Sequence, residues 1–217
     1  MWAAPSVANI YGIRAKITPF KGKIGVIGPP AGVEGKVQRL TRPVVLTGMM
    51  GAGKTAVGTQ LARLLGVPFR DSDEAIEAAA QMTVAEIFAR DGEAFFRARE
   101  AEVLARLLAA GPAVISTGGG AFLAPGNRAA IGAAGVSVWL KADLDLLWQR
   151  VRHRTTRPLL RTPDPRGTLA RLLAEREPSY ALAALTVAAE PGLSVEAMAG
   201  RVQAALETVP GLLQEVA

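Results

Sequence analysis

The chain has 217 residues, half of them hydrophobic, a formal net charge of +6 at pH 7 and no cysteine. A chain of this length and hydrophobicity can bury a sizeable core, so it is not a disordered polypeptide. The lack of cysteine excludes disulfides, thiolate metal sites and cysteine nucleophiles. No apolar run approaches the roughly 20 residues that a membrane-spanning helix needs, and the first residues lack the pattern of a secretory signal.

The positive charge is concentrated in the first 40 residues. This stretch holds six basic residues and a single acid, Glu34, whereas the rest of the chain holds 19 basic and 18 acidic residues. A nearly neutral body argues against a nucleic-acid-binding domain. Residues 1–40 are rich in Gly and Pro and lack helical periodicity. We therefore expect a poorly ordered basic extension over 1–40 and one folded domain over 41–217.

Beyond residue 42 the hydrophobic pattern alternates between strands and helices. Strands are expected at 43–47, 67–70, 113–117, 136–141 and 185–189. The longer helices are expected at 53–65, 93–110, 167–177 and 195–208. Shorter helices are expected to end near Arg90 and Arg152, and Thr83 with Glu86 fits a capping box at the start of the first of these. This alternation predicts an α/β fold in which helices cover both faces of a five-stranded parallel sheet.

Residues 48–55 read GMMGAGKT and fit the phosphate-loop pattern G-x-x-x-x-G-K-[ST] between an expected strand and an expected helix. Glycines let backbone N–H groups converge on phosphates, and the helix N-terminus adds the positive end of its dipole. Lys54 is expected to reach the β- and γ-phosphates and Thr55 to bind Mg²⁺. The residues expected to bind ATP here are Gly51, Ala52, Gly53, Lys54, Thr55 and Ala56. This motif alone does not distinguish a kinase from a GTPase or a motor.

Three further groups lie at positions suited to a second substrate. Asp71 and Asp73 follow the second strand, at the strand end where open parallel sheets bind ligands. One carboxylate could hold the water shell of a metal and the other could accept a proton from a hydroxyl, although an Asp or Ser72 could simply cap the next helix. Arg97 and Glu100 share a helix face, where they could serve a second substrate or simply form a solvated ion pair. Gly118–Gly120 follow the third strand and permit close approach of a ligand, or form a plain loop.

Residues 150–166 contain six arginines, three prolines and one acid, Asp164. Such a charged segment is usually a solvated surface. In a phosphate-loop enzyme it is also suited to a lid that closes over ATP, excludes water and balances charge, because the planar guanidinium donates paired hydrogen bonds to phosphate. The only histidine, His153, lies in this segment, and we expect it to have no catalytic role.

Taken together, the motifs resemble those of the shikimate kinase family over roughly residues 42–208. The segments that carry the resemblance are GMMGAGKT (48–55), DSD (71–73), FRARE (96–100), GGG (118–120), RPLL (157–160) and EREPSY (175–180). Each later segment is weak alone, but their joint order and spacing are specific. The resemblance implies a three-layer fold like that of nucleoside monophosphate kinases, with a lid at about 150–166. It also implies ATP-dependent phosphorylation of the 3-hydroxyl of shikimate, a step of aromatic amino acid biosynthesis, with Mg²⁺ as cofactor.

On the acceptor side, the resemblance implies roles for four residues. Asp73 would bind shikimate hydroxyls and serve as the base. Arg97 and Arg176 would bind the shikimate carboxylate, and Gly119 would contact the ring.

On the nucleotide side, the resemblance implies that Arg157 binds the phosphates from the lid. Asp71 would act on Mg²⁺ through water, beside Thr55. Arg150 would flank the adenine, and residues 188–192 fit the position of the adenine loop, although an arginine sometimes found there is missing. Lys54, Asp73 and Arg157 are the expected catalytic residues.

Three alternatives remain open from the sequence. A related small-molecule kinase, such as a gluconate kinase, would share the phosphate loop and lid. A non-enzymatic nucleotide-binding regulator could keep the fold, and the basic N-terminal stretch could bind nucleic acid. We expect instead a cytoplasmic monomer whose partners are ATP and shikimate, with no nucleic-acid or membrane partner.

Overall fold

The computed structural model describes residues 38–153, 158–160 and 162–215. The chain divides into two units, residues 1–31 and residues 32–217, and all described residues belong to the second. Residues 1–37 of the expected extension and Arg157 of the expected lid lie outside the described residues. Within the described ranges, no helix has both the length and the apolar character needed to cross a membrane.

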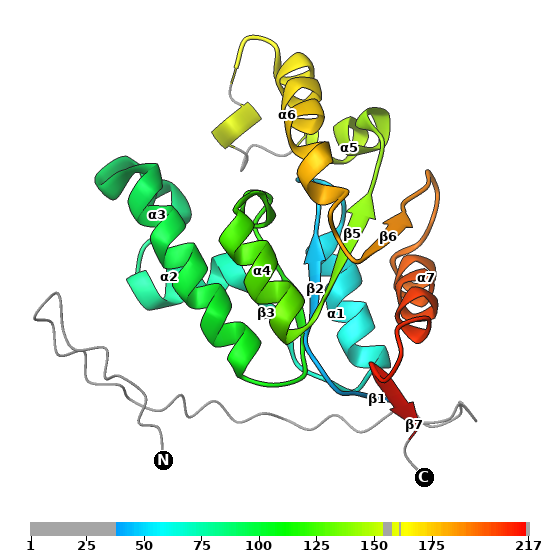
Figure 1. Cartoon of the computed structure of the whole chain (residues 1–217). Helices are drawn as coiled ribbons and strands as arrows, with labels where there is room; N and C mark the ends of the chain where they lie inside the picture. Colours follow the sequence, from blue (N-terminus) through cyan, green and yellow to red (C-terminus); the bar gives the residue numbers. More distant parts are fainter. Residues whose placement is uncertain (1–37, 154–157, 161, 216–217) are drawn as a thin grey trace, which may run out of the picture. The chain divides into compact units, whose positions relative to one another are not determined.

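Five parallel strands form the central sheet, in the order β3-β4-β2-β5-β6 (Figure 1). They are β2 Val44–Thr47, β3 Phe69–Asp71, β4 Val114–Ser116, β5 Val136–Lys141 and β6 Leu185–Ala188. All four residues of the central strand β2 are buried, as expected for a parallel strand covered on both faces. The parallel sheet expected from the sequence is confirmed, and each strand lies within two residues of its expected bounds.

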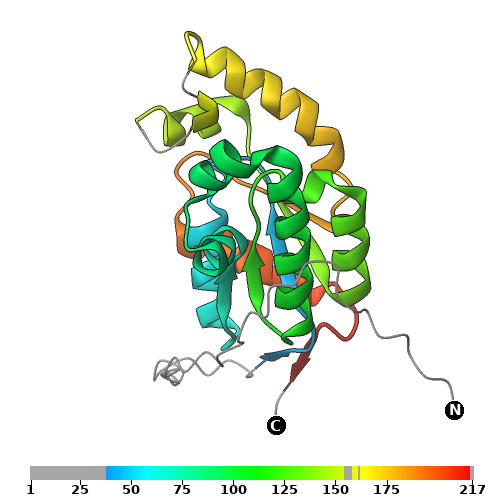
Figure 2. The ribbon, with the colours of Figure 1, turned by 90° about the vertical axis from the view of Figure 1, so that its left-hand side faces the viewer.

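Helices cover both faces of this sheet. On one face α1 (Lys54–Leu64) packs against α7 (Val195–Glu207), and on the other α3 (Val84–Ala109) packs against α4 (Pro125–Ala134). In the view of Figure 2, α6 (Pro165–Tyr180) crosses the end of the domain toward which the strands point. The resulting three layers are those of an α/β phosphate-loop fold. They place the carboxyl ends of the strands beneath α6, where open parallel sheets bind ligands.

The expected capping box is present at the start of α3. The Thr83 hydroxyl accepts from the backbone N–H of Glu86, and the Glu86 carboxylate accepts from the backbone N–H of Thr83. Gly92 has φ 80° and ψ 174°, so α3 breaks there into the two helices that the sequence indicated. The second of these carries Arg97 toward the strand ends.

Three parts of the fold lie outside the expected helices and strands. The helix α2 (Ser72–Ala80) begins within the DSD motif, where Asp71 caps it as the sequence also allowed, and α4 is a short alanine-rich helix that starts at a proline. A two-stranded antiparallel sheet joins β1 (Gln38–Leu40) to β7 (Leu213–Glu215). The last three residues of the expected extension over 1–40 are therefore ordered as a strand, which a three-residue segment is too short to signal.

A small hydrophobic cluster supports the helices next to the strand ends. Ile76 of α2 packs with Ile87, Phe96 and Val103 of α3, and all four are buried. Because Arg97 follows Phe96 directly, this cluster fixes the turn of α3 from which the arginine projects. The main core lies between the sheet and its flanking helices.

We expect Thr83→Ala to lower the free energy of unfolding by about 1 kcal/mol, because the substitution removes the side-chain cap of α3. Urea denaturation measures this change. The control is Thr59→Ala, since the Thr59 hydroxyl donates to the Thr55 carbonyl within α1 and its removal should change stability little. Equal losses in the two variants would contradict the importance of the capping box.

Candidate active site

The phosphate loop lies between β2 and α1 and depends on glycine conformations. Gly48, Gly51 and Gly53 have φ angles of 135°, 85° and 95°, in a region that side chains disfavour. A Cβ on Gly51 would also lie 2.7 Å from a methyl carbon of Val151. The Lys54 ammonium donates to the carbonyl oxygens of Gly48 (2.8 Å) and, within the same loop, Met49 (3.1 Å). The lysine head group is therefore held over the loop in which phosphates would lie.

Two oxygen ligands suited to Mg²⁺ meet beside this loop. The Thr55 hydroxyl donates to Oδ2 of Asp71 over 3.3 Å, and Oδ1 of Asp71 accepts from the backbone N–H of Asp73 over 3.0 Å. In the part of the chain that the structure describes, no group of three His, Asp or Glu side chains could hold a metal alone. This pair fits the mode in which Mg²⁺ binds through one or two protein oxygens together with phosphates and water.

The buried residue Ser72 connects the DSD motif to the glycine loop after β4. Its hydroxyl accepts from the backbone N–H of Gly118 over 3.2 Å. The two strands that precede these segments are neighbours, with Asp71 paired to Ser116, so their ends meet at one edge of the sheet. The sequence predicted functional roles for both aspartates and at most a helix cap for Ser72, because a serine between them gives no signal of a partner 46 residues away.

Three expected acceptor residues converge on Gly118–Gly120. A Cβ on Gly118 would lie 2.6 Å from the Asp73 carboxylate, and one on Gly120 would lie 2.5 Å from the Arg97 guanidinium. A Cβ on Gly119 would lie 3.5 Å from Nη1 of Arg176. Glycine is therefore required at two positions of this loop. A side chain at Gly118 would displace Asp73, and one at Gly120 would displace Arg97.

Arg97 is held by two carboxylates of its own helix. Its guanidinium donates to Glu100 over 2.9 Å and to Glu93 over 3.1 and 3.2 Å. It also lies over the rings of Phe88 and Phe96, with its central carbon 6.0 and 5.3 Å from the centroids. Arg97 keeps one third of its side-chain surface exposed, so it remains accessible to an anionic ligand.

Glu100 is buried, with 1% of its side-chain surface exposed, so the pair it forms with Arg97 is not the solvated ion pair that its spacing also allowed. Burial raises the pKa of Glu100, and the adjacent guanidinium offsets part of that rise. Burial lowers the pKa of Arg97, but its bonds to Glu100 and Glu93 outweigh this effect and raise it. A buried carboxylate therefore orients a permanently charged guanidinium.

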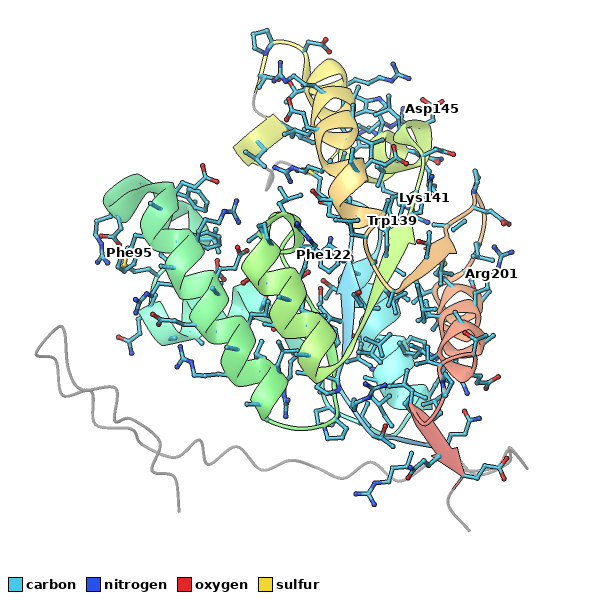
Figure 3. All side chains as sticks on the ribbon, in the orientation of Figure 1. Phe95, Phe122, Trp139, Lys141, Asp145 and Arg201 are labelled. Carbon is cyan, nitrogen blue, oxygen red and sulfur yellow. The ribbon has the colours of Figure 1, made fainter. Side chains whose placement is uncertain are left out.

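Arg176 lies on α6 beside a buried tyrosine. The hydroxyl of Tyr180 donates to the carbonyl oxygen of Gly119, lies 3.8 Å from the sulfur of Met49 and interacts with the Arg176 side chain. The last turn of α6 is also attached to β5, because Lys141 pairs with Glu177 over 3.0 Å. Figure 3 shows Lys141 and Trp139 together beside this end of α6. Tyr180 lies in the EREPSY motif, but no role for it could be predicted from the sequence.

The remaining expected nucleotide ligands are placed only in part. Nη1 of Arg150, on α5 (Leu144–Val151), donates to the carbonyl oxygens of Gly51 and Ala52 over 3.3 and 3.4 Å, so this arginine lies against the phosphate loop. Arg157 lies outside the described residues. The three-residue turn Pro158–Leu160 that follows it is described, with Leu160 buried.

Comparisons with known proteins agree with this site. A family model for shikimate kinase matches residues 50–207. The shikimate kinase of Cereibacter sphaeroides is 65% identical over 176 residues, which are 81% of this chain and 88% of that protein. The shikimate kinase of Ruegeria pomeroyi is 59% identical over 182 residues, which are 84% and 93% of the two chains. The solved structure of the Acinetobacter baumannii shikimate kinase in complex with shikimate is similar with a TM-score of 0.71 and 38% identity, covering 75% of this chain and 91% of that one.

These matches span most of the chain, and the family model includes residues 50–55 of the phosphate loop, the glycine loop and α6. They confirm the resemblance drawn from the motifs. The chain belongs to the shikimate kinase family and is a small-molecule kinase.

Proposed function

We propose that the chain transfers the γ-phosphoryl group of ATP to the 3-hydroxyl of shikimate. The observation that carries this proposal is the convergence of Asp73, Arg97 and Arg176 on the side-chain-free loop Gly118–Gly120, next to the phosphate loop. Two guanidiniums suit a carboxylate, and an aspartate suits a hydroxyl. Shikimate is a small ring acid with hydroxyl groups and presents both.

On the nucleotide side, the backbone N–H groups of residues 51–56 and the Lys54 ammonium would bind the phosphates. Arg150 would support the loop through its contacts with the Gly51 and Ala52 carbonyls and would extend toward the base. Arg157 is proposed as the phosphate-binding arginine of the lid. Lys54 and Arg157 would balance charge that spreads over the transferring group, which is where a phosphoryl-transfer enzyme gains most of its rate.

Mg²⁺ is the proposed cofactor, held by the Thr55 hydroxyl and, through water, by Asp71. These oxygens lie 3.3 Å apart, at the start of α1 and the end of β3. When bound, the metal would neutralise charge on the phosphates. The backbone N–H of Asp73 donates to Oδ1 of Asp71, and this bond orients the other oxygen of the Asp71 carboxylate toward Thr55.

On the acceptor side, Arg97 and Arg176 would bind the carboxylate and Gly119 would contact the ring. Asp73 would accept the proton of the attacking hydroxyl, since its carboxylate lies against Gly118 at the strand end. Closure of the lid over 150–166 would exclude water from this space.

A coupled ADP-release assay with ATP and Mg²⁺ tests the function, using shikimate, gluconate and no acceptor in parallel. The proposal expects turnover with shikimate alone. Turnover with gluconate would instead indicate a related kinase such as a gluconate kinase. ATP binding without any turnover would favour a non-enzymatic nucleotide-binding regulator.

Replacing the proposed base should separate chemistry from binding. We expect Asp73→Asn to lower kcat about 100-fold or more, because the amide cannot accept the hydroxyl proton. Steady-state kinetics with saturating ATP measure this. Asp91→Asn is the control, since Asp91 pairs with Arg90 on the surface. Near-normal turnover of Asp73→Asn would contradict the assignment of Asp73 as the base.

Removing the carboxylate-binding arginine should act mainly on the acceptor. We expect Arg97→Ala to raise the KM for shikimate about 10- to 100-fold with little change for ATP, because a charge-assisted hydrogen bond is lost. Arg99→Ala is a matched control on the same helix, since Arg99 pairs with Glu102 at the surface. Thermal unfolding is recorded as well, because Glu100 loses its partner. A rise in the KM for ATP alone would contradict the assignment.

A further inference from the structure

Tyr180 is a fully buried tyrosine at the point where α6 meets the glycine loop. It has 0% of its surface exposed and is one of the largest fully buried side chains among the described residues. Its ring packs against Trp139 with centroids 6.1 Å apart. A phenylalanine would fill the same volume without burying a hydroxyl, and a buried hydroxyl is unfavourable unless it is hydrogen-bonded. The hydroxyl must therefore be explained by its partners.

The groups around the Tyr180 hydroxyl come from the acceptor side of the site and from the phosphate loop. A phenol has one hydrogen, and Tyr180 donates it to the carbonyl oxygen of Gly119. The hydroxyl oxygen of Tyr180 and Nη1 of Arg176 lie 3.6 and 3.5 Å from the position that a Cβ on Gly119 would take, so both groups lie next to the same glycine. The sulfur of Met49, in the phosphate loop, lies 3.8 Å away and is the weaker contact. One hydroxyl thus joins the acceptor arginine to the glycine loop.

The glycine loop needs such a constraint because its residues have wide backbone freedom. Ser72 holds the N–H of Gly118, and turn bonds use the carbonyls of Gly118 and Gly120. Among the residues described, Tyr180 is the side chain that binds the carbonyl between them. Since a trans peptide is planar, fixing the Gly119 carbonyl also directs the N–H of Gly120 away from Tyr180. The hydroxyl therefore sets the orientation of the peptide on which an acceptor would lie.

The same hydroxyl remains a donor across the physiological range. Burial raises the pKa of Tyr180, although the charge of Arg176 and its hydrogen bond partly counter that rise. The Tyr180 hydroxyl therefore stays protonated although the positive charge of Arg176 lies close by.

We infer that Tyr180 is a positioning residue for the acceptor, acting through the Gly119 carbonyl and the Arg176 guanidinium. The inference rests on the proposed function, because it concerns how shikimate is bound. A purely structural role would depend on the packing of the ring, whereas a positioning role depends on the hydroxyl that orients the Gly119 peptide. A substitution can separate the two. Tyr180→Phe keeps the ring beside Trp139 and removes the hydrogen bond to Gly119 together with the hydroxyl that lies near Arg176.

The test compares Tyr180→Phe with Ser137→Ala by steady-state kinetics and thermal unfolding. Ser137 is a matched control: its buried hydroxyl accepts from the N–H of Ala184 over 2.9 Å and so attaches the chain just after α6 to β5. We expect Tyr180→Phe to raise the KM for shikimate about tenfold, the effect of roughly one lost hydrogen bond, and to change the KM for ATP by less than about twofold. Ser137→Ala should lower the unfolding temperature without changing the KM for shikimate.

Two kinetic outcomes would overturn the inference: an unchanged KM for shikimate in folded Tyr180→Phe, or equal increases in KM for shikimate and ATP. Turnover of shikimate by the unaltered chain is measured in the same experiment, and its absence would refute the proposed function instead.

A second measurement does not depend on the folding of Tyr180→Phe. The chain has two tyrosines, Tyr11 and Tyr180, so 3-fluorotyrosine incorporated into Tyr11→Phe reports on position 180 alone. We expect its fluorine resonance to shift when shikimate is added and to shift less with ATP alone. A resonance that does not move at saturating shikimate would contradict a positioning role.

Discussion

The arrangement of this site depends on the absence of side chains at Gly118–Gly120. The loop leaves the carboxyl end of β4, and the space that side chains would fill is occupied by the Asp73 carboxylate and the Arg97 guanidinium, with Arg176 at contact distance of the middle position. Three groups from three different helices can meet there only because the backbone itself forms one wall. The parallel sheet brings that wall beside the phosphate loop, since β2 and β4 are neighbours.

Several side chains of this arrangement have a defined supporting partner. The buried Glu100 carboxylate orients Arg97, Asp71 accepts from the Thr55 hydroxyl and Ser72 accepts from the Gly118 N–H. The Asp73 carboxylate lies against Gly118. Charged side chains held in this way are pre-oriented before a substrate arrives, which lowers the ordering cost of binding. The family shown by the comparisons fits a site built for a small anion with a reactive hydroxyl.

The sequence predicted the features that follow from local patterns and missed those that depend on distant partners. Buried apolar runs predicted the five strands, and the spacing of Thr83 and Glu86 predicted a capping box. In contrast, β1 and β7 are three-residue strands whose pairing joins the two ends of the domain. The burial of Glu100 and the bond from Tyr180 to Gly119 arise from packing between segments far apart in the chain. Motifs locate such residues but do not state which atoms they contact.

Substitution of a single glycine tests the central role of the loop most directly. Gly120 has φ −97°, which alanine tolerates, so Gly120→Ala adds only a methyl group, 2.5 Å from Nη1 of Arg97. Gly126→Ala, in α4, adds the same group where no atom lies within 4 Å. Kinetics and unfolding of the two variants are compared. The account predicts a KM for shikimate raised about tenfold or more in Gly120→Ala alone, with stability nearly retained. An unchanged KM in that variant would contradict the account.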